Sequence, residues 1–101
     1  MISTNDLQRR YTKIYKCLMH YIFDFKIVEA LADFEIAVYR IFPDLDEISK
    51  TFGILKNELK YSGLEYEDLD KALDRFDELL SDKEIYYGIK TFREVIDNEN
   101  N

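Results

Sequence analysis

Cys17 and His20 are the pair in this sequence whose residue types and spacing come closest to a reactive or metal-binding arrangement. They are the one cysteine and the one histidine of the chain, and a separation of three residues places them near each other on one face of a helix. Such a pair could join a thiol to an imidazole, or supply half of a zinc site completed by carboxylates. No orienting group or further ligand stands nearby in the sequence, so we expect a small cysteine near the core and a partly exposed histidine.

Other signatures of catalysis are missing from the sequence. The three glycines, Gly53, Gly63 and Gly88, are isolated, so no glycine-rich loop could cradle a phosphate. The acidic segment 44–47 is too short for a calcium loop, which spreads its ligands over about twelve residues, and it is better interpreted as a helix cap. We therefore expect a protein that is not an enzyme and that holds no cofactor or metal. A small metal-binding helical bundle is an alternative.

Segment 65–84 carries the strongest charge signal, because nine of its twenty residues are acidic. On a helix, its acids form a stripe that is rotated by about 100° from the apolar stripe. The candidate partner-binding residues on and beside this stripe are Glu67, Asp70, Asp74, Asp77, Glu78 and Glu84. They indicate either a solvated face that keeps the protein soluble or a surface that attracts a basic protein partner.

Imitation of nucleic-acid phosphates is a special case of the second interpretation, with a basic nucleic-acid-binding protein as the partner. One helical turn rises ~5.4 Å, whereas one DNA strand presents a charge about every 3.4 Å along its axis. A single acidic stripe is therefore sparser than a strand. Mimicry would need further acids arranged alongside it.

The charge of the chain is uneven along its length. Residues 1–20 carry a net charge of +3, residues 61–101 carry −7, and the whole chain carries −7. Arg9, Lys13, Lys16 and His20 fall on one side of the first predicted helix. Because the molecule as a whole repels phosphate, we expect no direct binding of nucleic acid. The basic stripe is predicted to be solvated or to face the acidic helix, within one chain or across two.

Helical periodicity runs through most of the chain. Apolar residues recur at steps of three and four, and they predict helices over about 4–23, 24–42, 44–61 and 65–80. A fifth helix, capped by Ser81 and Glu84, is predicted to run to about 97. The first two could instead form one helix over 4–42, although Asp24 is a plausible cap at a bend. Pro43 and the pair Ser62-Gly63 are stop signals, and Gly53 could kink the third helix. The fold predicted is an all-α compact antiparallel bundle of four to five helices.

This bundle is expected to be one domain over 1–97, followed by a frayed polar tail at 98–101. Eight tyrosines and seven phenylalanines are more rings than so small a bundle readily buries. The surplus predicts a homodimer, with Phe23, Tyr39, Tyr86 and Tyr87 as the self-association residues. The second helix is apolar on most sides, which is typical of a central helix or of a subunit contact.

Several features bear on where the protein works. The first ten residues are charged where a signal peptide would be apolar, and the apolar region 21–42 holds six charged residues, which disfavours a membrane span. A lone cysteine suits the cytoplasm. The abundance of Ile, Lys, Asn, Tyr and Phe indicates an AT-rich genome, such as that of a low-GC bacterium, a phage or a mobile element.

Together these observations predict a small acidic interaction protein, not an enzyme, that inhibits or bridges a protein partner. An anti-restriction or anti-CRISPR inhibitor fits the composition by analogy. An immunity or antitoxin-type protein that neutralises a cognate toxin is an alternative.

Overall fold

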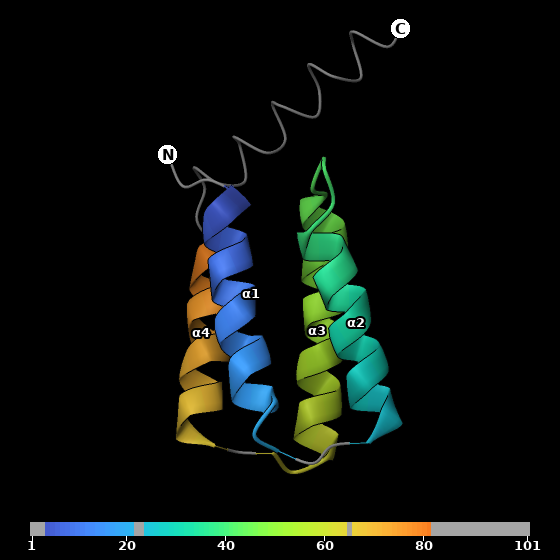
Figure 1. Cartoon of the computed structure of the whole chain (residues 1–101), viewed down its shortest axis with the longest axis vertical. Coiled ribbons are helices and arrows are strands. Elements are labelled where there is room, and N and C mark those ends of the chain that lie inside the picture. Colours follow the sequence, from blue (N-terminus) through green and yellow to red (C-terminus); the bar gives the residue numbers. More distant parts are fainter. Residues whose placement is uncertain (1–3, 22–23, 65, 82–101) are drawn as a thin grey trace, which may run out of the picture.

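Four helices follow one another in the part of the chain that the computed structural model describes, which is residues 4–21, 24–64 and 66–81. They are α1 (Thr4–Leu18), α2 (Phe25–Val38), α3 (Leu45–Tyr61) and α4 (Glu67–Leu80). Each helix runs opposite to the one before it, α1 lies beside α4, and α2 lies beside α3 (Figure 1). The prediction of an all-α antiparallel bundle is confirmed. The fifth helix expected between the cap at Ser81 and about residue 97 and the tail at 98–101 lie outside the described residues.

The break between the first two helices lies where the sequence placed it. Asp24 is extended, with φ −80° and ψ 173°, and its carboxylate accepts a hydrogen bond from the Ile27 amide at 3.1 Å. That bond satisfies one of the free amides at the start of α2. The alternative of one helix over 4–42 is therefore wrong. α1 ends at Leu18, five residues before the predicted end, and two tight turns follow it.

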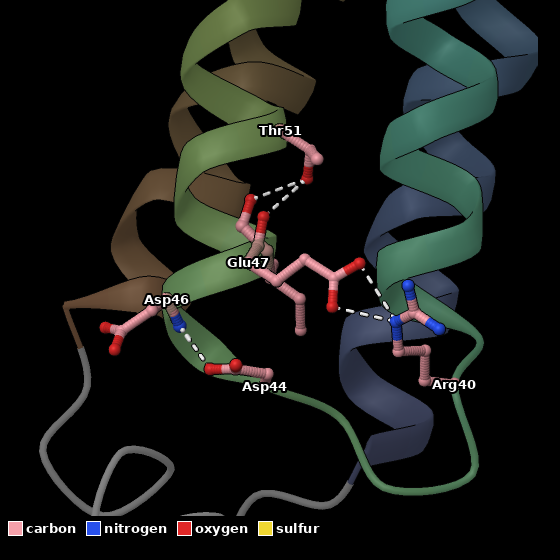
Figure 2. A network of polar contacts seen from close by, with 6 residues as sticks. Arg40, Asp44, Asp46, Glu47 and Thr51 are labelled. Atoms are coloured by element: carbon pink, nitrogen blue, oxygen red, sulfur yellow. Dashed lines mark hydrogen bonds and ion pairs between the residues drawn. The ribbon is translucent and has the colours of Figure 1, made fainter.

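The turn between α2 and α3 is closed by an ion pair. The two carboxylate oxygens of Glu47 accept from Arg40 Nε at 2.9 and 2.7 Å (Figure 2). Asp44 caps α3 by accepting from the Asp46 amide at 3.0 Å. α2 ends at Val38, four residues before the predicted end, so Pro43 lies in the turn and does not itself terminate the helix.

The end of α3 matches its stop signal. Gly63 has a φ of +68°, and the amide of Leu64 bonds back to the Leu59 carbonyl at 3.1 Å. A residue without Cβ occupies this left-handed conformation without strain. Gly53 does not split the helix, which continues unbroken from Leu45 to Tyr61.

The core is built from the faces that the periodicity predicted. Phe34, Phe52 and Phe76 form its aromatic centre, with ring centroids 4.8 to 5.3 Å apart, and so join α2, α3 and α4. The other buried residues at the predicted positions are Leu7, Tyr11, Ile14, Leu18, Ile27, Leu31, Val38, Ile48, Leu55, Leu59 and Leu69. The periodicity did not pick out Ala30, Ala37, Ala72 and Leu79, which are also buried.

Three residues assigned to the core stripes are exposed instead. Phe25 begins α2 on its outer side, Ile41 lies in the turn after α2, and Tyr66 lies at the start of α4. The ring of Tyr66 stacks on Tyr21 with centroids 3.9 Å apart. Among the described residues, no helix combines the length and the apolar character needed to cross a bilayer.

Candidate functional site

The acidic residues of α4 do not share one environment. Glu67 pairs with Lys71 on its own helix at 3.1 Å, and Asp77 pairs with Lys56 of α3 at 2.9 Å. Asp70 and Asp74 are exposed, and they line a shallow groove of about 440 Å³ between α3 and α4. Two lysines, Lys56 and Lys60, line the same groove. The negative charge on this flank is therefore partly balanced within the molecule.

The last two predicted partner-binding residues lie elsewhere. Glu78 is on the other flank of α4, in a cavity that it shares with basic residues of α1 and with Arg75. Glu84 lies outside the described residues. The sequence alone shows which helix is acidic, but the pairing of Asp77 depends on a lysine brought in by the tertiary fold.

One of the four predicted self-association residues falls in the described part of the chain. Tyr39 follows α2 and is 47% exposed, while its ring packs edge-on against Tyr11 at 5.7 Å. It therefore has one side against the core and one side toward solvent. Phe23, Tyr86 and Tyr87 lie outside the described residues.

The outer face of α2 is the most unusual surface of the described bundle. Its members are Phe25, Val28, Ala32, Ile36 and Tyr39, at successive steps of three, four, four and three residues. Their spacing places them on one side of the helix, opposite to the side that carries the buried residues. Phe25 is 78% exposed, Val28 46% and Ile36 55%. α2 is thus apolar on two opposite sides, of which only one is packed against other described residues.

Carboxylates border the middle of this face. Glu29, Asp33 and Glu35 are exposed, and none of them makes an ion pair with another described residue. Lys26 lies near the start of the helix, and Arg40, two residues after its end, is engaged by Glu47. Exposed side chains of this kind steer an oppositely charged partner toward the surface they surround.

The Cys17–His20 pair is placed as the less reactive interpretation predicted. Cys17 is partly buried against the core, and burial together with the Asp68 carboxylate raises the pKa of its thiol. It is therefore kept as a neutral thiol at neutral pH, whereas a nucleophile or metal ligand needs the thiolate. His20 is exposed. Within residues 4–21, 24–64 and 66–81, no three histidine, cysteine or acidic side chains gather as a metal site.

Two surfaces are thus left to explain, the outer face of α2 and the basic cavity between α1 and α4. Comparison with protein-family models, with curated proteins and with solved structures finds no match to this chain.

Proposed function

We propose that this is an interaction protein, not an enzyme, that docks through the outer face of α2 onto a basic, partly apolar surface of a protein partner and so inhibits or bridges that partner. The observation that carries the proposal is the run of large apolar side chains exposed along one side of α2. A contiguous exposed apolar patch with a polar border is typical of a protein–protein contact.

The chemistry of the border selects the partner. Glu29, Asp33 and Glu35 flank the patch and are exposed, so a partner that carries Lys or Arg around an apolar centre complements it. An amphipathic helix with basic flanks has this pattern, with apolar residues at steps of three and four. The apolar centre would supply affinity, and the charged border would supply orientation and association rate.

A second copy of the chain is the competing occupant. The outer face is symmetric about Ala32, because its other members stand four and seven residues to either side. Two copies could therefore pack antiparallel with the alanines at the crossing point, as an isologous dimer requires. That arrangement would bring Glu29 and Asp33 of one copy close to the same two carboxylates of the other. Like charges at a contact are unfavourable, so the border favours a basic partner over a homodimer.

In this proposal the acids of α4 are less important for docking than the outer face of α2. Asp70 and Asp74 are exposed beside two lysines, which suits attraction at long range better than close imitation of a phosphate strand. An inhibitor of a basic nucleic-acid-binding protein and an immunity or antitoxin-type protein would use the same docking chemistry. They differ in the identity of the partner. The lone Cys17 is compatible with either in the cytoplasm.

The test compares two isoleucines of similar exposure. Ile36 belongs to the outer face of α2 and is 55% exposed, while Ile54 of α3 lies outside that face and is 46% exposed. Lysate of the source cells is passed over immobilised wild-type protein, Ile36→Glu and Ile54→Glu, and the captured proteins are quantified. We expect one basic protein to be retained by wild type and Ile54→Glu and lost with Ile36→Glu. If no captured protein distinguishes the two variants, the proposal is wrong.

Two measurements on the purified protein identify other occupants of the face. Light scattering that shows a dimer for wild type and a monomer for Ile36→Glu assigns the face to a second copy. Thermal melting that shows a loss of stability for Ile36→Glu but not for Ile54→Glu assigns it to the chain's own residues beyond the described part. Either result contradicts docking of a different protein there.

A further inference from the structure

A groove lined mainly by basic side chains runs between α1 and α4. Its two halves have volumes of about 350 and 320 Å³ and share Arg10, Lys13 and Arg75. Lys16 and Lys71 line the first half, and Arg9 lines the second. In a chain with a net charge of −7, a groove bordered by six cationic side chains is unexpected. The wall of its first half is mainly apolar, so the charged groups lie at its rim. Three residues of the basic stripe predicted on the first helix, Arg9, Lys13 and Lys16, thus line the groove against α4. His20, the fourth, does not, and the stripe meets two cations of α4 as well as its acids.

Four of these six cations form no ion pair with another described residue. Arg9 pairs with Asp6, and Lys71 pairs with Glu67. In the part of the chain that the structure describes, Arg10, Lys13, Lys16 and Arg75 make no ion pair. Positive charge is therefore concentrated where the two halves meet, because Arg10 and Lys13 of α1 lie there together with Arg75 of α4. Like charges placed close together repel one another, and a bound anion would relieve that repulsion.

Acidic side chains mark both ends of the groove. Asp68 lines the first half, next to Cys17, and accepts a hydrogen bond from the Tyr21 hydroxyl at 3.3 Å. Asp6 and Glu78 line the far end of the second half. The positive segment is therefore short. From Arg9 to Lys16, the first and last cations of α1 in the groove, it covers seven residue steps, or ~10 Å at a rise of ~1.5 Å per residue.

We propose that this groove binds a small polyphosphate anion, such as an inorganic triphosphate or a nucleoside triphosphate. A length of ~10 Å accommodates about three phosphates at the ~3.4 Å charge spacing of a nucleic-acid strand. Arg10 and Arg75 offer planar guanidinium groups for paired hydrogen bonds to phosphate oxygens, and Lys13 and Lys16 offer mobile ammonium groups. The acids at the ends disfavour a long nucleic-acid strand, because a strand that continued past them would meet like charge.

This site is separate from the docking surface proposed above. No residue of α2 lines the groove, so anion binding and partner binding fail or succeed independently. The source of the phosphate chain is left to the experiment. Inorganic triphosphate tests the chain of phosphates alone, and ATP adds a base and a sugar.

The test is titration calorimetry of the 101-residue protein with sodium tripolyphosphate and with ATP at low salt. We expect saturable binding with one site per chain. Replacing Arg10 and Arg75 together by Gln should weaken it by about tenfold or more, since bonds to charged groups are the strong ones. Lys60→Gln, which removes one exposed cation outside the groove, is the control and should retain wild-type affinity. Circular dichroism checks folding of each variant, and Arg75→Lys keeps the charge if Arg75→Gln fails to fold.

Each outcome decides the proposal. Binding of triphosphate and ATP with equal affinity supports it with the phosphate chain as the recognised group, and tighter binding of ATP supports it with a contribution from the nucleoside. The proposal is overturned if neither ligand binds at millimolar concentration, or if Lys60→Gln weakens binding as much as the groove variants. It is also overturned if a single-stranded oligonucleotide binds more tightly than both.

Discussion

Truncation of the two most exposed apolar side chains of α2 should separate partner binding from folding. Phe25→Ala with Ile36→Ala removes the large side chains at positions that are 78% and 55% exposed. Complete burial of a side chain of this kind contributes about 1.5–3 kcal/mol. With roughly three quarters of Phe25 and half of Ile36 still in contact with water, docking would gain about 2 and 1 kcal/mol from them. The double variant should therefore lose about 3 kcal/mol of binding free energy, or ~150-fold in Kd.

The same truncation should leave the isolated protein almost unchanged. The exposed parts of these side chains make no core contacts, and alanine has a higher helix propensity than isoleucine or phenylalanine. We expect the free energy of unfolding, measured by urea titration, to change by less than about 1 kcal/mol. Kd is then measured by biolayer interferometry against the protein that the capture experiment identifies.

The control for this experiment is Ile54→Ala, at a position that is 46% exposed on α3. It should reproduce the small effect on unfolding and leave Kd at its wild-type value. The reasoning would be refuted if the double variant bound as tightly as wild type, or if Ile54→Ala weakened binding equally. A large loss of stability in the double variant would also refute it, because it would show that these side chains are packed.

Three further predictions concern stability. Phe34→Ala should cost about 3–5 kcal/mol in urea unfolding, because Phe34 is fully buried between Phe52 and Phe76; a cost below about 1 kcal/mol would contradict the described core. Gly63→Ala should cost about 1–2 kcal/mol, since its φ of +68° is unfavourable for a residue with Cβ although the space around it is open; an unchanged urea midpoint would contradict that turn. Burial and the nearby Glu35 raise the pKa of Tyr11 above its ordinary value, so the folded state holds the phenolic proton longer than the unfolded state. Stability should therefore be unaffected by this group below about pH 10 and fall above it by up to ~1.4 kcal/mol per pH unit, and Tyr11→Phe should reduce the fall measured by urea titrations from pH 8 to pH 11.

The helices and their packed faces could be predicted because local rules and tertiary packing agree there. Apolar residues spaced by three and four, such as Leu55 and Leu69, are buried in the structure. The break at Asp24 follows from a local cap, which sequence shows directly. Phe25 was assigned to the core by extending the apolar stripe of the first helix, and Ile41 by extending that of the second. Each helix ends before the residue in question, so steps of three and four no longer predict which way its side chain points.

The candidate surfaces were harder to predict because they depend on which elements meet. A helix that is apolar on two sides, as α2 is, does not reveal from sequence which side packs against α3. In the same way, the acidity of α4 is plain from sequence, but Lys56 reaches Asp77 only through the packing of α3 on α4. The basic groove also requires two helices, since Arg10 and Arg75 are far apart in sequence and line one cavity.

The most direct test of the docking surface is photo-cross-linking from single positions. A photoreactive phenylalanine analogue is placed at position 36, on the outer face of α2, or at position 54, on α3, and the protein is irradiated with its captured partner. We predict a covalent adduct from position 36 and none from position 54. An adduct from position 54 with none from position 36 would contradict the assignment of α2 as the docking surface.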